Sequence, residues 1–334
     1  MNETLQKTPQ AGSTALSKLD QLKSMTKVVA DTGDIDAIKT YKPVDCTTNP
    51  SLVLKAMELK AYAHIFEEAI AWGKKQGGKP EAIAKAVAGR LPIDIGAELA
   101  RIVPGRVSTE VDADLSFDVE GSLARAHEII AAYKERGVDK EKILIKLAST
   151  FEGTKAASIL EKAGIHCNMT LLFALPQAVI CFEAGATLIS PFVGRIYDWH
   201  VKHDGHDFAP ADDPGVQSVK RIYAYAKRHG HKTTVMGASF RNVGEVEALA
   251  GCDALTIAPA WLETLSKDNG VLKRQLEPLQ AAKEGADRIA LDERAFRWAL
   301  NEDAMATEKL AEGIRLFAAD LGKLRKEVAK RLGG

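Results

Sequence analysis

The sequence has few cysteines, no net charge and no long apolar run, and each of these absences excludes a class of protein. The 45 basic residues balance the 45 acidic ones, whereas proteins that bind nucleic acids or membrane surfaces usually carry a basic excess. No apolar run approaches the length of a membrane span. We therefore expect neither nucleic acid nor a membrane as a partner.

The four cysteines are scattered along the chain and include no C-x-x-C pair. They are Cys46, Cys167, Cys181 and Cys252. A disulfide framework and a zinc ribbon are both disfavoured, and the pattern fits a protein of the reducing cytoplasm. The segment from Met1 to about Ser17 is polar and lacks the apolar core of a signal peptide, which agrees with a cytoplasmic location.

No linker rich in proline, glycine or serine divides the chain of 334 residues. We therefore predict a single folded domain over residues 19–334, preceded by a flexible extension over residues 1–18. Neither a Walker-type loop nor a G-x-G-x-x-G dinucleotide fingerprint occurs, so the sequence predicts no nucleotide-binding motif.

Short runs rich in apolar and β-branched residues recur along the chain and predict strands. They are Lys27–Ala30, Asp45–Thr48, Val107–Val111, Ile143–Ala148, His166–Leu172, Thr187–Pro191, Thr233–Ala238 and Ala254–Ile257. Amphipathic helical patterns lie between them, including Ser51–Lys75, Glu120–Arg136, Thr154–Ala163, Pro176–Ala184, Gly215–His229 and Val243–Ala250. Alternating strands and helices indicate an α/β fold of parallel units. The repeat predicts a (β/α)8 TIM barrel, with a doubly wound open sheet as the alternative.

Two segments exceed what a minimal barrel needs, so we expect additional helices toward both ends of the chain. More than one helix must fill Ser51–Arg101, because the second and third strands are far apart. A charged helical tail, about Asp292–Leu332, follows the last strand and is expected to cover a barrel end or another subunit.

Lys146 is the most informative single residue, because it interrupts a run that otherwise has the pattern of a strand buried on both faces. Burying a charged ammonium is costly, so a neutral amine becomes accessible near physiological pH. A Schiff-base nucleophile requires such an amine. The alternative is a lysine at a strand end whose ammonium reaches water or pairs with an acid.

Polar residues gather where the other predicted strands end, and a barrel enzyme places its chemistry at strand ends and the following loops. Ser108, Glu110 and Asp112 fall on one face of the third strand, because side chains alternate with a period of two. The others are Asp31, Asn49, Asn168, Thr170, Ser190, Phe192, Arg195, Ser239 and Arg241. Together with Lys146, these residues predict a concave polar site.

Several of these residues also have a structural interpretation. Asp31 and Asn49 would shape turns, and Thr170 would hydrogen-bond the backbone. Arg195 would pair with Asp198 on its own helix. Each of these residues alone is better explained structurally, but their concentration at successive strand ends favours a site.

Two arginines indicate the kind of substrate. Ser239 and Arg241 follow the seventh strand, near the usual phosphate position of such barrels, and Arg195 follows the sixth. Two guanidinium groups and a hydroxyl suit a phosphate monoester. The sequence therefore predicts a phosphorylated small molecule as the substrate.

A possible metal motif, His-x-x-His-x-x-His, is formed by His200, His203 and His206. The surrounding stretch, Trp199–Pro210, is polar and has the pattern of a loop, and this spacing does not suit one helical face. We therefore predict no metal site here.

Several long motifs, in order from about Leu19 to the C-terminal helix, resemble those of the transaldolase family. They are Val28-Val29-Ala30-Asp31-Thr32-Gly33-Asp34, Thr47-Thr48-Asn49-Pro50-Ser51, Ser108-Thr109-Glu110-Val111-Asp112-Ala113, Ile145-Lys146-Leu147-Ala148-Ser149-Thr150, Ser190-Pro191-Phe192-Val193-Gly194-Arg195, Met236-Gly237-Ala238-Ser239-Phe240-Arg241-Asn242, Leu255-Thr256-Ile257-Ala258-Pro259 and Lys309-Leu310-Ala311-Glu312-Gly313-Ile314.

This resemblance implies a (β/α)8 barrel, usually dimeric, in the non-oxidative pentose phosphate pathway. It implies transfer of a dihydroxyacetone unit from sedoheptulose 7-phosphate to glyceraldehyde 3-phosphate, giving erythrose 4-phosphate and fructose 6-phosphate. It also implies that neither a metal nor an organic cofactor is needed.

The resemblance assigns roles residue by residue. Lys146 matches the Schiff-base lysine, and Asp31 matches the acid/base that acts on the hydroxyl beside the breaking bond. Glu110 and Thr170 match the pair that positions a catalytic water. Residues matching those that hold the donor's hydroxyls are Asn49, Asn168 and Ser190. Residues matching those that bind phosphate are Arg195, Ser239 and Arg241.

Phe192 bears on the choice between transfer and simple cleavage. Fructose-6-phosphate aldolases, which have a similar barrel, carry tyrosine at the matching place, and a tyrosine hydroxyl would help to protonate the enamine. Phenylalanine lacks that donor, which favours transfer, unless Phe192 serves only for packing. Two alternatives remain: an aldolase of the same barrel type, and a non-catalytic sensor of sugar phosphates.

Overall fold

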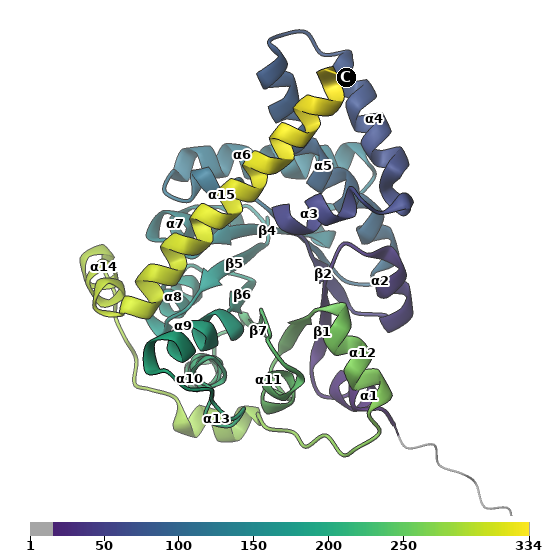
Figure 1. Cartoon of the computed structure of the whole chain (residues 1–334). Coiled ribbons are helices and arrows are strands. Elements are labelled where there is room, and N and C mark those ends of the chain that lie inside the picture. The colour runs from purple at the N-terminus through teal and green to yellow at the C-terminus, as the bar shows by residue number, and fades with distance from the viewer. Residues whose placement is uncertain (1–15, 334) are drawn as a thin grey trace, which may run out of the picture.

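The predicted strands close into one parallel barrel in sequence order, seen end-on in Figure 1. This is a computed structural model, and it describes residues 16–333. The strands are β1 (Lys27–Asp31), β2 (Asp45–Thr47), β3 (Val107–Glu110), β4 (Ile143–Ala148), β5 (Cys167–Leu172), β6 (Leu188–Pro191), β7 (Thr234–Gly237) and β8 (Ala254–Ile257). Because β1 pairs with β8, the open-sheet alternative is excluded and the (β/α)8 prediction is confirmed.

At least one helix follows each strand and packs outside the barrel. These helices are α2 (Ile35–Tyr41), α3 (Pro50–Ala56), α4 (Ala63–Lys74), α5 (Pro80–Ile102), α6 (Val119–Glu135), α7 (Phe151–Lys162), α8 (Leu175–Glu183), α9 (Gly194–Asp204), α10 (Pro214–Arg228), α11 (Val243–Ala248) and α12 (Pro259–Lys267). Single 3-10 turns are η1 (Lys60–Tyr62), η2 (Ala113–Leu115) and η3 (Lys140–Lys142). The long gap after β2 therefore holds three helices, as its length predicted.

Additional helices precede and follow the barrel units. They are α1 (Lys18–Lys23), α13 (Pro278–Glu284), α14 (Glu293–Glu302) and α15 (Ala304–Gly333). Ser17 caps α1 by accepting a hydrogen bond from the Asp20 N–H, so α1 begins at Lys18, the last residue of the predicted extension. The rest of that extension, residues 1–15, lies outside the described residues.

The barrel interior is layered, and the two-residue alternation of strands explains the layers. An apolar plug fills the lower layer and is formed by Val29, Leu144, Leu188, Met236 and Ala254. Two positions further along β1, β4, β6 and β8, the inward residues are polar: Asp31, Lys146, Ser190 and Thr256. The plug therefore forms the floor of a polar chamber at the carboxyl ends of the strands.

Helix α15 crosses the carboxyl end of the barrel, as the yellow helix in Figure 1 shows. Arg325 on α15 pairs with Asp112 at the end of β3, with 2.9 Å between nitrogen and oxygen. Gly313 lets α15 approach β5, because a Cβ there would lie 2.6 Å from the Leu171 side chain. The tail thus covers a barrel end of its own chain, one of the two predicted possibilities.

The histidine-rich stretch differs from its prediction. The segment predicted as a loop continues α9 as far as Asp204, so His200 and His203 are helical. Both rings contact the Asp204 carboxylate, at 3.1 and 2.7 Å, while His206 lies beyond the helix. Across residues 16–333, no three His, Cys, Asp or Glu side chains are grouped so as to hold a metal ion. The same residues include no helix with the length and apolarity that crossing a bilayer requires.

Candidate active site

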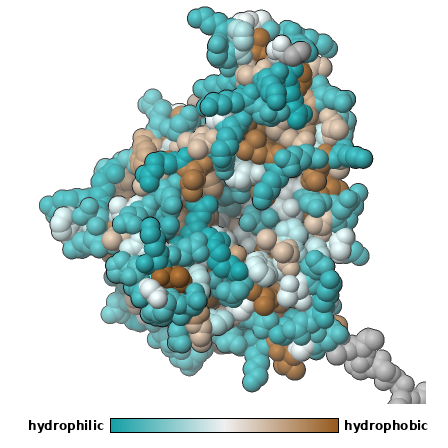
Figure 2. Space-filling view, viewed as in Figure 1, coloured by the Kyte–Doolittle hydropathy of each residue, from teal (hydrophilic) through white to brown (hydrophobic). Residues whose placement is uncertain are grey.

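A cavity opens into the barrel mouth beside α15. Its volume is about 440 Å³ when the space open to solvent is included. The face of the molecule in Figure 2 is largely hydrophilic and is hollowed near its centre, where Figure 1 shows the barrel mouth. The residues that line the cavity are Asp31, Thr47, Asn49, Lys146, Thr170, Ser190, Phe192, Arg195, Met236, Ala238, Ser239, Thr256 and Phe317.

Lys146 and Glu110 form a buried pair at the cavity wall. The two residues are register partners on β4 and β3, so their side chains enter the barrel side by side. Lys146 Nζ lies 3.3 Å from Glu110 Oε2, and the side chains are only 7% and 8% exposed. Burial raises the pKa of Glu110, although Lys146 and Arg195 oppose that shift. The pair therefore joins an amine to a carboxyl group that readily keeps a proton.

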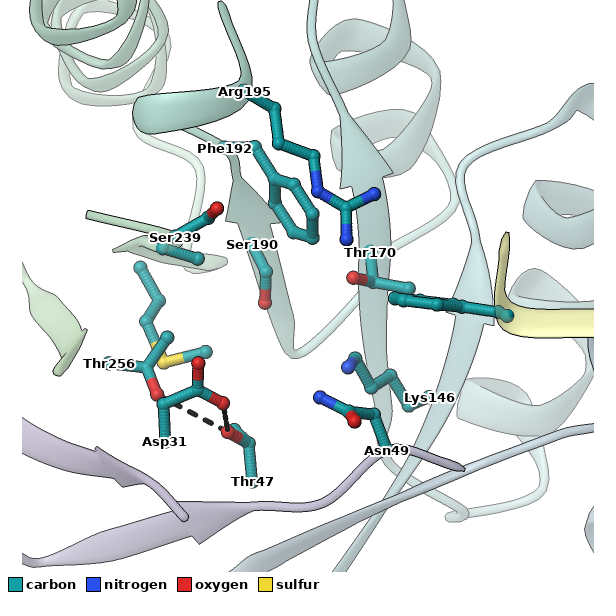
Figure 3. A pocket seen from close by; sticks show the side chains of 13 residues that line it. Asp31, Thr47, Asn49, Lys146, Thr170, Ser190, Phe192, Arg195, Ser239 and Thr256 are labelled. Atoms are coloured by element: carbon teal, nitrogen blue, oxygen red, sulfur yellow. Dashed lines mark hydrogen bonds between the residues drawn. The ribbon is translucent and has the colours of Figure 1, made fainter. Parts of the chain in front are cut away.

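Asp31 faces Lys146 across the cavity. Figure 3 shows the two side chains pointing into the same space from β1 and β4. The Thr47 hydroxyl donates to the Asp31 carboxylate at 3.0 Å and lies 3.3 Å from the Thr256 hydroxyl. Asp31 is thus oriented by its neighbouring strand while its carboxylate remains open to the cavity, and it is more than a turn residue.

Thr170 enters the cavity just before an irregularity in β5. The pairing of β5 with β6 shifts register between Met169 and Leu172, and Leu171 has a φ of 52°. The Thr170 hydroxyl is buried and has no hydrogen-bond partner within residues 16–333. The predicted alternative, a hydrogen bond to the backbone, is therefore not observed.

The amide and hydroxyl residues form a connected chain in the wall. Ser190 donates to Asn168 Oδ1 at 2.6 Å, and Asn168 Nδ2 donates to Ser108 at 3.0 Å. Asn168 is fully buried behind Ser190 and does not line the cavity. Asn49 lines it, while its Oδ1 caps α3 by accepting from the Leu52 N–H at 2.9 Å. Asn49 therefore shapes a turn, as the alternative held, and also faces the site.

The arginines occupy different depths. Arg195 lines the cavity with its guanidinium 4.9 Å above the Phe192 ring and 5.4 Å from the Phe317 ring. Its Nη1 is buried without a hydrogen-bond partner within residues 16–333, and burial and the Arg241 charge lower its pKa. Arg241 is outside the lining and pairs with Asp198 at 2.6 Å. The predicted alternative pairing of Asp198 with Arg195 is therefore replaced by one with Arg241.

Ser239 has an unusual backbone. Its φ of 63° is left-handed, a conformation that costs a non-glycine residue free energy and occurs often at functional sites. The Ser239 carbonyl accepts from the Gly194 N–H at 2.7 Å, and Arg241 Nη1 donates to the Ser239 hydroxyl at 3.3 Å. The loops after β6 and β7 are thus locked together beside Arg195.

Sequence reasoning missed some lining residues. Phe317 lies on α15 and covers Lys146, with Nζ 5.7 Å from the ring centre. Nothing in its local sequence marks it, because α15 is an ordinary amphipathic helix. Thr256 was detectable, since it lies two positions beyond the plug residue Ala254 on β8.

Known proteins resemble the chain over almost its whole length. A profile of the family described as transaldolase/fructose-6-phosphate aldolase matches residues 28–328. The transaldolase of Rhizobium etli is 62% identical over 316 residues, which cover 95% of this chain and 98% of the relative. The transaldolase of Agrobacterium fabrum is also 62% identical over the same length. That of a Marinomonas species is 55% identical, covering 95% of this chain and 99% of the relative.

Proposed function

The chain belongs to the transaldolase/fructose-6-phosphate aldolase family and is a transaldolase, and we propose that it works through a Schiff base on Lys146. In this proposal it moves a dihydroxyacetone unit from sedoheptulose 7-phosphate to glyceraldehyde 3-phosphate, yielding erythrose 4-phosphate and fructose 6-phosphate. The observation that carries the proposal is the buried Lys146 amine, 3.3 Å from Glu110 and opposite Asp31.

The first step is attack of neutral Lys146 on the C2 carbonyl of the ketose. Proton transfers then convert the carbinolamine to an iminium ion and release water. Glu110 is placed to exchange these protons because it adjoins the amine, and its raised pKa favours the protonated form, which has a proton to give. The buried hydroxyl of Thr170 supports the same step, since a water between it and Glu110 would satisfy its hydrogen-bonding capacity.

The second step breaks the C3–C4 bond. Asp31 takes the proton of the C4 hydroxyl, C4 becomes the aldehyde carbon of the leaving aldose phosphate, and the bond's electron pair moves into the iminium to form an enamine. Asp31 suits this step because it faces Lys146 and is held by the Thr47 hydroxyl. When the acceptor aldehyde binds, the same proton returns from Asp31 to the new hydroxyl as the carbon–carbon bond forms.

The enamine must survive until the acceptor arrives, so stray proton donors have to be kept away from it. Phe192 and Phe317 supply aromatic walls, and α15 crosses one side of the barrel mouth. Arg195, Ser239 and Arg241 would bind the phosphate, with the guanidinium of Arg195 available inside the cavity. Asn49 and Ser190 line the cavity and would hold the donor's hydroxyls, and Asn168, behind them, would act by accepting the hydrogen bond of the Ser190 hydroxyl.

The test is release of glyceraldehyde 3-phosphate from fructose 6-phosphate, with and without erythrose 4-phosphate. Acceptor-dependent release supports the proposal, whereas release without acceptor identifies an aldolase. No release from folded protein would favour a non-catalytic sensor.

We also propose that the enzyme acts in the pentose phosphate pathway, in the cytoplasm, as a homodimer. Light scattering at several concentrations tests the dimer.

Replacing Phe192 with tyrosine is expected to raise acceptor-independent cleavage by about tenfold or more, because the new hydroxyl would protonate the enamine. The Phe192 ring lines the cavity and is 6% exposed, so the hydroxyl would lie within the site. The measurement is the rate of dihydroxyacetone release without acceptor. Phe192→Leu, which adds no donor, is the matched control; an equal rise in both variants would assign Phe192 to packing alone.

A further inference from the structure

Two buried carboxyl groups, those of Asp213 and Glu245, lie behind the proposed phosphate-binding residues. Asp213 is 1% exposed and Glu245 is 0% exposed. The two carboxyl groups lie close enough together that each shifts the pKa of the other. Neither lines the cavity, and the proposed reaction uses neither of them.

Asp213 is tied to the loop after β6, which leads into Arg195 at the start of α9. Its Oδ1 caps α10 by accepting from the Gly215 and Val216 N–H groups, at 2.7 and 3.2 Å. The start of α10 presses on the loop after β6, because a Cβ on Gly215 would lie 2.2 Å from the Val193 carbonyl oxygen. Moving Asp213 would therefore move the backbone that leads into Arg195.

Glu245 is tied to the loop that carries Ser239 and Arg241. Its Oε2 accepts from the Arg241 N–H at 2.7 Å. On the same helix, Asn242 caps α11 by accepting from the Glu245 N–H at 3.0 Å. The carboxyl group therefore fixes the backbone of Arg241, just beyond the left-handed residue Ser239.

The two loops are also joined directly, so the carboxyl pair supports a single unit. Val193 donates to the Ala238 carbonyl at 2.8 Å and Gly194 to that of Ser239 at 2.7 Å. Gly194 leaves no space at this junction, since a Cβ would lie 2.4 Å from the Ser239 carbonyl oxygen. Such close packing transmits a shift on one side to the other.

Two adjacent buried carboxyl groups cannot both ionise without strong repulsion, so the pair favours holding one proton. Burial and the nearby Asp213 raise the pKa of Glu245 to about 7. The titratable groups that face the pair are Arg241 on its loop and Tyr197 and His200 on α9. The cations among them are already engaged, since Arg241 pairs with Asp198 and His200 contacts Asp204.

We propose that Asp213 and Glu245 share one proton and together form a positioning pair for phosphate binding by Arg195, Ser239 and Arg241. The inference rests on the proposed function in taking a phosphate ester as the ligand. When the pair holds one proton, it links α10, which contacts the loop after β6, to the loop after β7. When that proton is lost, the two carboxylates repel each other, and the two loops move out of the arrangement that binds phosphate.

The first test compares Glu245→Gln with Glu245→Ala. Glutamine keeps an oxygen for the Arg241 N–H and an amide donor for Asp213, so it imitates the protonated pair. Alanine removes both contacts and is expected to raise KM for fructose 6-phosphate by about tenfold, with kcat changed less than about threefold. Glu247→Gln, on the same helix but paired with Lys18 at 2.8 Å, is the matched control.

The second test is the pH dependence of KM, measured at about pH 6 and about pH 8.5, on either side of the Glu245 pKa of about 7. The wild type and Glu245→Gln should agree at the lower pH. At the higher pH, KM of the wild type should be about threefold or more above that of Glu245→Gln. The substrate phosphate ionises equally in both assays, so the ratio of the two KM values reports only on the carboxyl pair.

Stability provides an independent readout with a definite sign. An unfolded glutamate loses its proton near its ordinary pKa, whereas folded Glu245 keeps it to about pH 7. The folded state therefore binds more protons between these values, and the wild type loses stability as pH rises through this window. Glu245→Gln has no such loss, so its Tm advantage over the wild type should grow from about pH 5 to about pH 8.

A KM ratio between wild type and Glu245→Gln that stays constant with pH would overturn the shared proton. A Glu245→Ala variant with unchanged KM would overturn the positioning role. Binding of inorganic phosphate, measured by calorimetry, separates this inference from the proposed function. If the wild type binds phosphate but transfers no dihydroxyacetone unit, the proposed function is wrong. The phosphate affinities of the wild type and the Glu245 variants would still test whether the carboxyl pair positions the phosphate-binding residues.

Discussion

Lys146→Ala is expected to lower the rate of transfer by about 10⁴-fold or more, because no other group can form the covalent intermediate. Lys146 is the lysine that lines the cavity, and its amine adjoins the proton-exchanging Glu110. The measurement is acceptor-dependent release of glyceraldehyde 3-phosphate. Borohydride reduction of a mixture with fructose 6-phosphate should add a sugar-derived mass to the wild type at Lys146 and nothing to the variant.

The variant also needs a folding control, since it removes a buried ion pair. Removing Lys146 also removes a charge that opposes the raised pKa of Glu110, so the buried carboxyl group can take up a proton more readily instead of staying an unpaired charge. Circular dichroism and Tm should therefore stay close to those of the wild type. Lys155→Ala is the matched variant, because Lys155 on neighbouring α7 is exposed and 3.7 Å from Glu293. A borohydride adduct elsewhere, or substantial activity without Lys146, would contradict the Schiff-base assignment.

The layers of the barrel interior could be predicted because they depend on residues that are close together in the sequence. Side chains alternate along each strand, so a polar residue two positions beyond an apolar one predicts a plug below a polar chamber. Leu144 and Lys146 on β4 follow this rule, as do Val29 and Asp31 on β1. The register then aligns Glu110, Lys146 and Asn168 across three strands. Strand patterning alone thus brought together most of the candidate site.

Features that depend on the meeting of distant helices were not predictable in this way. Phe317 reaches Lys146 only because α15 crosses the barrel mouth. Asp213 and Glu245 are 32 positions apart and each caps or supports its own local turn, so neither one indicates the other. The pairing of Asp198 with Arg241 instead of Arg195 has the same origin, because Arg241 reaches Asp198 from a separate loop, the one after β7. The periodicity of apolar residues indicates which face of a helix or strand is buried, but not which distant element packs against that face.

Asp31→Asn is expected to lower kcat by about 10²- to 10⁴-fold while leaving Schiff-base formation intact. Asparagine can still accept the Thr47 hydroxyl, which donates to Asp31 at 3.0 Å, so the local geometry should persist. It cannot take the C4 hydroxyl proton, and cleavage of the C3–C4 bond should therefore stall. The prediction separates the two chemical roles, since Lys146 acts before the bond breaks and Asp31 acts as it breaks.

The mass of the borohydride adduct distinguishes these stages directly. With fructose 6-phosphate, the wild type should carry a three-carbon adduct on Lys146, because the aldose phosphate has left and borohydride traps the remaining enamine through its iminium tautomer. Asp31→Asn should instead carry the intact six-carbon phosphate. Asp34→Asn is the matched control: Asp34 caps α2 by accepting from the Asp36 N–H at 2.9 Å, and asparagine caps equally well. A three-carbon adduct formed at the wild-type rate by Asp31→Asn would show that another group removes the proton. The absence of any adduct would instead place Asp31 in the formation of the Schiff base, because the stalled step would then precede the iminium ion.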